Sequence, residues 1–120
     1  MPITINGSNT PTAGGVVYGD GTTYASTAIS FTAKTTAYTA VTGDNILANT
    51  LGGAFTITLP ATPTTGNTVY IQDSSGTFAT SPLTVARNGS TIMGLAEDMV
   101  VSTNNVGFGL TYNGSDWRIY

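Results

Sequence analysis

The sequence predicts an all-β protein, and three observations support this prediction. Apolar and polar residues alternate along several segments from residue 36 onward, which is the period of a half-buried strand. Thr, Ser, Asn and Gly make up 57 of the 120 residues, and they suit the outward faces of strands and the turns between them. No segment longer than a few positions has the spacing of an amphipathic helix.

The strongest strand signal lies at residues 55–59, where Phe55, Ile57 and Leu59 alternate with two threonines. The loop at residues 73–82 is expected to bury Phe78, and Asn113-Gly114 is expected to turn the last two strands into a hairpin. The remaining strands are predicted at residues 36–41, 45–49, 68–72, 83–87, 99–102, 108–112 and 116–120. A spacing of roughly ten residues predicts a compact antiparallel sandwich or a jelly-roll-like barrel.

Residues 1–33 are expected to form an extended N-terminal arm that precedes a β-sandwich domain at residues 34–120. Glycines and prolines interrupt the apolar pattern before residue 16. The turn signal Gly19-Asp20-Gly21 makes residues 16–27 either a short hairpin or an extended segment. The arm itself is either a tail without fixed structure or a segment that becomes ordered on a neighbouring subunit.

The composition excludes several classes of function. The chain has no His and no Cys, which argues against disulfides, zinc sites, Cys nucleophiles and His-based acid–base chemistry. Three basic and six acidic residues give a net charge of −3, which argues against nucleic-acid binding and a polybasic membrane anchor. The sequence has no run of about 18 apolar residues and no signal-peptide pattern, so no membrane span and a cytoplasmic synthesis are expected.

The carboxylates give only weak indications of a catalytic or metal site. Asp73, Glu97 and Asp98 lie outside obvious turns, but no His or Cys accompanies them, so solvated loops are favoured over catalysis. Asp20, Asp44 and Asn45 lie in Gly-rich turns without calcium-loop spacing, and turn formation is favoured over calcium binding there. We therefore expect no enzyme activity, no cofactor and no metal.

The aromatic residues of the last hairpin are the candidate surface site. Tyr112, Trp117 and Tyr120, with Arg118 beside them, could form a surface contact or a platform on which a glycan stacks. Tyr112 and Trp117 could equally be cross-strand partners in the core, and packing is the favoured alternative.

Several segments in one order resemble a small β domain of tailed-bacteriophage virion proteins. The matching pieces include Gly53-Ala54-Phe55-Thr56-Ile57-Thr58-Leu59-Pro60 and the ending Leu110-Thr111-Tyr112-Asn113-Gly114-Ser115-Asp116-Trp117-Arg118. Further pieces lie at residues 13–21, 38–41, 44–47, 66–69, 83–85 and 87–92. Such domains occur in capsid decoration (cement) proteins and in tail or head fibre modules.

The resemblance implies a structural role in the virion, synthesis in the host cytoplasm and a homotrimer. A chain of 120 residues is short for a fibre, which favours a capsid decoration protein that binds the major capsid protein and sister subunits. The alternative is a tail- or head-fibre domain that contacts a host glycan or receptor. Under the decoration hypothesis, the arm contacts the capsid or a sister subunit through Ile3, Ile5, Val16, Val17 and Tyr18.

Overall fold

The computed structural model describes residues 15–17, 23–25 and 30–120 of the chain. In the N-terminal part, β1 (Gly15–Val17) pairs antiparallel with β2 (Thr23–Ala25), and this confirms the hairpin alternative. Val16 and Val17 are residues of β1, whereas the predicted contact residues Ile3, Ile5 and Tyr18 lie outside the described residues.

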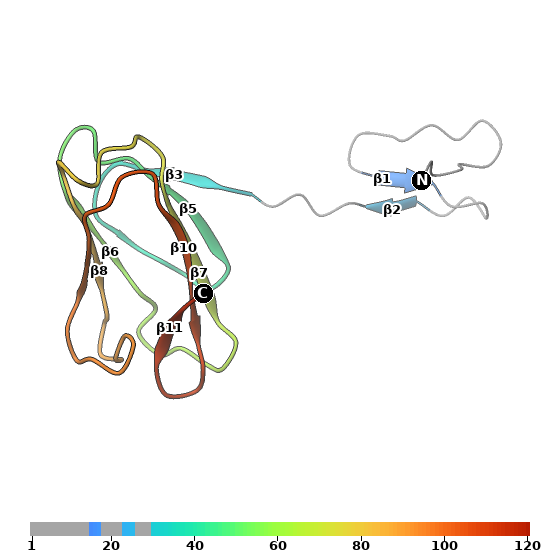
Figure 1. Cartoon of the computed structure of the whole chain (residues 1–120). Helices are drawn as coiled ribbons and strands as arrows, with labels where there is room; N and C mark the ends of the chain where they lie inside the picture. The colour runs from blue at the N-terminus through green and yellow to red at the C-terminus, as the bar shows by residue number, and fades with distance from the viewer. Residues whose placement is uncertain (1–14, 18–22, 26–29) are drawn as a thin grey trace. The chain divides into compact units, whose positions relative to one another are not determined.

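The larger part of the chain, residues 31–120, folds as a separate unit of two mixed sheets, seen as two layers in Figure 1. The five-stranded sheet has the order β11-β10-β7-β5-β3 and the four-stranded sheet the order β4-β6-β8-β9. The strands of the first sheet are β3 (Thr32–Lys34), β5 (Asp44–Ala48), β7 (Thr68–Asp73), β10 (Gly107–Tyr112) and β11 (Trp117–Ile119). Those of the second are β4 (Tyr38–Thr39), β6 (Phe55–Thr58), β8 (Leu83–Ala86) and β9 (Met99–Val101). The described residues therefore confirm an all-β fold.

From β3 to β8 the chain passes alternately from one sheet to the other. As a result β3, β5 and β7 pair in parallel in one sheet, and β4, β6 and β8 pair in parallel in the other. Each of β4, β5, β6 and β7 thus lies in the connection between two parallel strands of the other sheet. Antiparallel pairs follow at β8–β9, β7–β10 and β10–β11.

The predicted antiparallel sandwich or jelly-roll is therefore wrong in its strand directions. The two layers of a sandwich are present, but a jelly-roll consists of antiparallel strands, and here all four pairs among β3 to β8 are parallel. The error has a physical origin: alternation of side chains identifies a strand and its buried face, and it is the same in both directions.

The core lies between the two sheets and takes one face of each strand. In β6, Ile57 is fully buried while Thr56 and Thr58 are only half-buried, as the alternation predicts. Phe78 is also fully buried, which confirms the prediction for its loop. The buried apolar residues are Ala40, Ile46, Ala48, Ile57, Leu59, Val69, Ile71, Phe78, Leu83, Val85, Ile92, Leu110 and Trp117.

The division between the two units falls after Ser30, and β3 begins at Thr32. The predicted boundary after residue 33 thus falls inside β3, whose residues Thr32–Lys34 pair in parallel with residues 46–48 of β5.

The described residues include no helix that is long and apolar enough to cross a membrane.

Candidate assembly interface

The two sheets have edge strands β3 and β4 on one side of the sandwich, which is called the β3–β4 end here. This end carries polar and charged groups. The ammonium group of Lys34 lies 3.9 Å from the centre of the Tyr38 ring. The Tyr38 hydroxyl donates to Asp44 Oδ2 at 2.8 Å, and the same oxygen accepts the Val41 N–H at 2.9 Å. The hydrogen bond to Asp44, burial and the Asp44 charge all raise the pKa of Tyr38. A lysine at an edge discourages pairing with another strand.

The other two edge strands, β9 and β11, lie on the opposite side of the sandwich, called the β9–β11 end here. This end carries an apolar groove instead. The groove has a volume of about 390 Å³ and lies between residues of both sheets. Its apolar lining comprises Met99, Val100, Val101, Val106, Phe108 and Ile119. A concave apolar surface between two sheet edges is suited to receive side chains of another protein.

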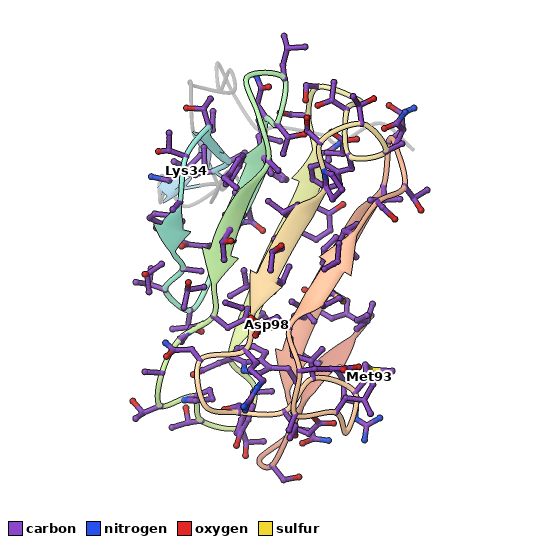
Figure 2. All side chains as sticks on the ribbon, turned by 90° about the vertical axis from the view of Figure 1, so that its left-hand side faces the viewer. Lys34, Met93 and Asp98 are labelled. Atoms are coloured by element: carbon purple, nitrogen blue, oxygen red, sulfur yellow. The ribbon has the colours of Figure 1, made fainter. Side chains whose placement is uncertain are left out.

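A second hollow of about 260 Å³ adjoins this groove and widens the apolar surface. Met93, Leu95 and Val100 line it and are exposed, with Val100 the most exposed at 62 %. Glu97 and Asp98 line the same hollow. Figure 2 shows Met93 on the opposite side of the sandwich from Lys34, so the two ends differ in chemistry.

The edges of the two strands at this end are not equally covered. The Trp117 N–H of β11 donates to the Thr91 carbonyl at 3.0 Å, and the Met93 N–H donates to the Trp117 carbonyl at 2.8 Å. Residues 91–93 thus cover part of the β11 edge. In contrast, β9 pairs only with β8 among the described strands, and its other edge is open. The structure therefore presents an open, uncharged strand edge beside an apolar groove.

Sequence reasoning predicted a short strand at residues 99–102 but missed its role at the edge. The available signal was the sequence Met99-Val100-Val101, three apolar residues in succession without a charge or proline. In an outer strand, charges and prolines are the residues that usually prevent further pairing. The signal could not be used because the strand order was unknown.

The structure places Trp117 in the core, so the glycan-platform hypothesis for this residue is wrong. Its side chain is fully buried, and the Tyr112 ring packs against it with centres 5.5 Å apart at an interplanar angle of 63°. Tyr112 is half-buried. The favoured packing alternative is thus confirmed for this pair, because a fully buried ring has no face on which a ligand could stack.

The other two residues of the candidate site are at the surface. The Arg118 side chain is 48 % exposed, and its Nε lies 2.8 Å from Asp116 Oδ2. Tyr120 is 65 % exposed. The structure therefore divides the predicted site into a buried aromatic pair and two surface residues.

Asp73 organises a loop rather than an open site. Its side chain is buried, and its two oxygens accept the backbone N–H groups of Gly76, Thr77, Phe78 and Asn105 at 2.9 to 3.3 Å. Burial alone would raise the pKa of Asp73, but these four hydrogen bonds favour the charged form, and the pKa is lowered. The carboxylate holds the loop that carries Phe78 into the core.

Asp116 has a similar role in the last hairpin. One oxygen accepts the Thr91 hydroxyl at 2.8 Å, and the other accepts the Gly94 N–H at 3.0 Å and the Arg118 guanidinium. Burial acts to raise the pKa of Asp116, but the bonds from Thr91 and Gly94 and the charge of Arg118 lower it. This network fixes residues 91–94 against the hairpin.

Comparison with known proteins identifies the family. The profile of the family described as bacteriophage T4 gp9/10-like protein, N-terminal, matches residues 3–119. No curated protein matches the chain. The match covers nearly the whole chain and agrees with the predicted resemblance to phage virion domains. The chain is thus a structural protein of the phage virion that assembles with other virion proteins, and it belongs to the bacteriophage T4 gp9/10-like N-terminal family.

Proposed function

We propose that this chain is an assembly domain of a virion appendage and that the β9–β11 end is its docking surface. The observation that carries the proposal is the open, uncharged edge of β9 beside the apolar groove. Exposed strand edges bind extended segments through main-chain hydrogen bonds, while pockets beside them select alternate side chains. The partner is an extended, uncharged segment of another virion protein with apolar residues at every second position.

We also propose that the domain binds its partner and catalyses no reaction. Asp44, Asp73 and Asp116 accept hydrogen bonds within turns and loops, and Asp98 accepts the Arg87 N–H at 2.9 Å. These carboxylates therefore serve local structure. A general acid or base must instead be free to exchange a proton with a substrate. The concave surfaces at the β9–β11 end are lined mainly by apolar side chains, which supports docking of a protein segment.

The family supports a component of the tail-fibre or baseplate type over a capsid decoration protein. The two differ in copy number, because a decoration protein covers the shell and an appendage protein occurs a few times per particle. Quantitative mass spectrometry of purified virions, with the major capsid protein as reference, separates them. A small fraction of the capsid copy number is expected. A copy number comparable with that of the capsid protein would restore the decoration hypothesis. The homotrimer stays a prediction, and light scattering of the purified protein tests it.

The docking surface is tested with Val100→Lys in virions produced by complementation. Val100 is exposed, so the variant should fold, but a lysine in β9 hinders pairing of another strand. Incorporation into virions is expected to fall strongly. The matched control is Leu51→Lys, which changes an apolar residue that is 73 % exposed and does not line the groove. Normal incorporation of Val100→Lys, or equal loss in both variants, would contradict the proposed docking surface.

A further inference from the structure

The outer face of the five-stranded sheet carries a row of aromatic side chains. In the strand register, Tyr70 of β7 lies opposite Gly109 of β10. Tyr120 exchanges two backbone hydrogen bonds of 2.9 and 3.2 Å with Gly109 on its other side. The Phe31 ring lies 6.1 Å from the Tyr70 ring at an interplanar angle of 85°. Phe31, Tyr70 and Tyr120 therefore form one row across the strands, named here the aromatic shelf.

The aromatic shelf faces away from the core. Leu110 follows Gly109 and is fully buried, as are the two neighbours of Tyr70, Val69 and Ile71. Because successive side chains of a strand point to opposite faces, the positions of Gly109 and Tyr70 face outward. Ile119 lines the groove, and Tyr120, the next residue, belongs to the outward row. The shelf is thus a surface separate from the proposed docking groove.

Two glycines allow the tyrosine side chains to lie against the sheet. A Cβ atom at Gly109 would collide with the Tyr120 ring, and one at Gly107 would collide with the Tyr70 hydroxyl. Neither glycine has a left-handed backbone, so space rather than conformation requires glycine here. One face of the Tyr120 ring thus covers Gly109, while the residue remains 65 % exposed. The opposite face of this ring is available to a ligand.

Polar groups border the aromatic shelf without adding a net charge. The exposed side chain of Gln72 lies opposite Gly107 in the register, and Thr68 lies opposite Thr111 in the row on the other side. Arg118 lies opposite Thr111 and is paired with the carboxylate of Asp116. Amide and hydroxyl groups beside an open aromatic face are chemically suited to a ligand with one apolar face and a rim of hydroxyl groups.

We propose that the aromatic shelf binds a neutral glycan. A pyranose ring has an apolar C–H face that stacks on the negative face of an aromatic ring, and its hydroxyl groups can bond to Gln72 and Thr111. The shelf crosses the strands, so consecutive sugars of one chain can meet Tyr120 and Tyr70. A neutral ligand is favoured because the Arg118 charge is already paired. The proposal moves the expected glycan contact from Trp117 to the outer face of the sheet.

The test uses the full chain in native affinity gels that contain a neutral polysaccharide. Four probes are run separately: an α-glucan, a β-glucan, a mannan and a galactan. At least one is expected to retard the protein. Tyr120→Ser is expected to raise the apparent Kd about tenfold or more, because the substitution removes the aromatic face on which a sugar stacks. Tyr120→Phe keeps that face and should bind as the natural protein does. Leu51→Ser is the control for loss of an exposed apolar residue elsewhere.

Three outcomes would overturn the proposal. The first is that none of the four probes retards the protein. The second is that Tyr120→Ser, shown by circular dichroism to be folded, binds unchanged or loses no more affinity than Leu51→Ser. The third is concentration-dependent self-association that disappears in Tyr120→Ser, which would make the shelf a contact between copies. If Tyr120→Ser does not fold, Phe31→Ser takes its place, because Phe31 is 45 % exposed at the other end of the shelf.

Discussion

At the scale of single residues, Trp117 tests whether the last hairpin belongs to the core. The side chain is fully buried, and its Nε1 has no hydrogen-bond partner among the described residues. Trp117→Ala should lower the free energy of unfolding by about 3–5 kcal/mol, which is comparable with the whole stability of a small domain. Trp117→Phe should lower it less, because the unpaired N–H is removed together with the lost volume.

Urea unfolding followed by circular dichroism measures both Trp117 variants. Trp117→Ala is expected to be largely unfolded without denaturant, and Trp117→Phe to unfold at a reduced urea concentration. A folded Trp117→Ala protein with a loss below about 1 kcal/mol would contradict the burial described for this ring.

Asp73 is the polar residue whose replacement should be most costly to local structure. Asp73→Ala leaves the N–H groups of Gly76, Thr77, Phe78 and Asn105 without their acceptor. A loss of about 2–3 kcal/mol in the free energy of unfolding is expected, because hydrogen bonds to a charged group are stronger than neutral ones. Denaturant titration measures the loss.

The exposed carboxylate Glu97 provides the control for Asp73. Glu97→Ala also removes one negative charge but should change stability by less than about 0.5 kcal/mol. Equal effects of the two variants would show that net charge, and not the hydrogen bonds of Asp73, sets the stability.

Single residues also show where sequence reasoning reached its limit. The burial of Phe78 could be predicted because one large apolar side chain stands in a polar loop. The complete set of four hydrogen bonds to Asp73 could not, because one of them comes from Asn105, which is 32 positions away. For Trp117 the sequence left packing and glycan binding open, since alternation does not tell which face of a hairpin meets the other sheet.

At the scale of elements, the strands could be predicted better than their pairing. Strands β6, β7, β8 and β10 lie where alternation predicted them, and Asn113-Gly114 lies in the hairpin between β10 and β11. The parallel pairs could not be predicted, because each joins strands separated by a strand of the other sheet. The open edge of β9 and the aromatic shelf depend on this order. The sequence therefore pointed to Tyr120 as a candidate surface residue but not to the open edge or to the row that Tyr120 forms with Tyr70 and Phe31.

The β10–β11 turn offers a test of backbone conformation. Gly114 has a φ of +103°, which strains any other residue, and a Cβ atom there would lie 2.9 Å from the Thr65 hydroxyl. Gly114→Ala should lower the free energy of unfolding by about 1 kcal/mol or more, which corresponds to roughly 4–8 °C in Tm. Differential scanning calorimetry measures the shift.

The matched control for the turn is Gly52→Ala. Gly52 has no positive φ, and an added Cβ would meet no atom within 4 Å. Its Tm should stay within about 2 °C of the natural value or rise slightly, because alanine restricts the unfolded chain. If both variants lost the same stability, the left-handed conformation of Gly114 would not be the cause.

At the scale of the whole molecule, stability should decline at both ends of the pH range. Asp73 and Asp116 have pKa values below the ordinary 3.8 in the folded protein, so the unfolded chain binds protons more readily in acid. Their stabilising contribution is present above about pH 4 and is lost as the pH falls through the folded pKa values. Tyr38 has a pKa above the ordinary 10.0 in the folded protein. Its contribution to stability is therefore fully present below about pH 10 and is lost as the pH rises through the folded pKa.

Stability is therefore expected to be constant, on a plateau, between about pH 4 and pH 10 and to fall on an acid and an alkaline limb outside this range. The two limbs should respond to different variants. Urea midpoints measured at intervals across this range describe the profile. Asp73→Asn should reduce midpoints on the plateau and make the acid limb shallower, since the group that gains a proton on unfolding is gone. Tyr38→Phe should leave the acid limb unchanged and make the alkaline limb shallower. The Tyr38–Asp44 contact belongs to the β3–β4 end, whereas Asp73 holds the Phe78 loop. An acid limb that is unchanged in Asp73→Asn would show that other groups, and not Asp73, control acid unfolding.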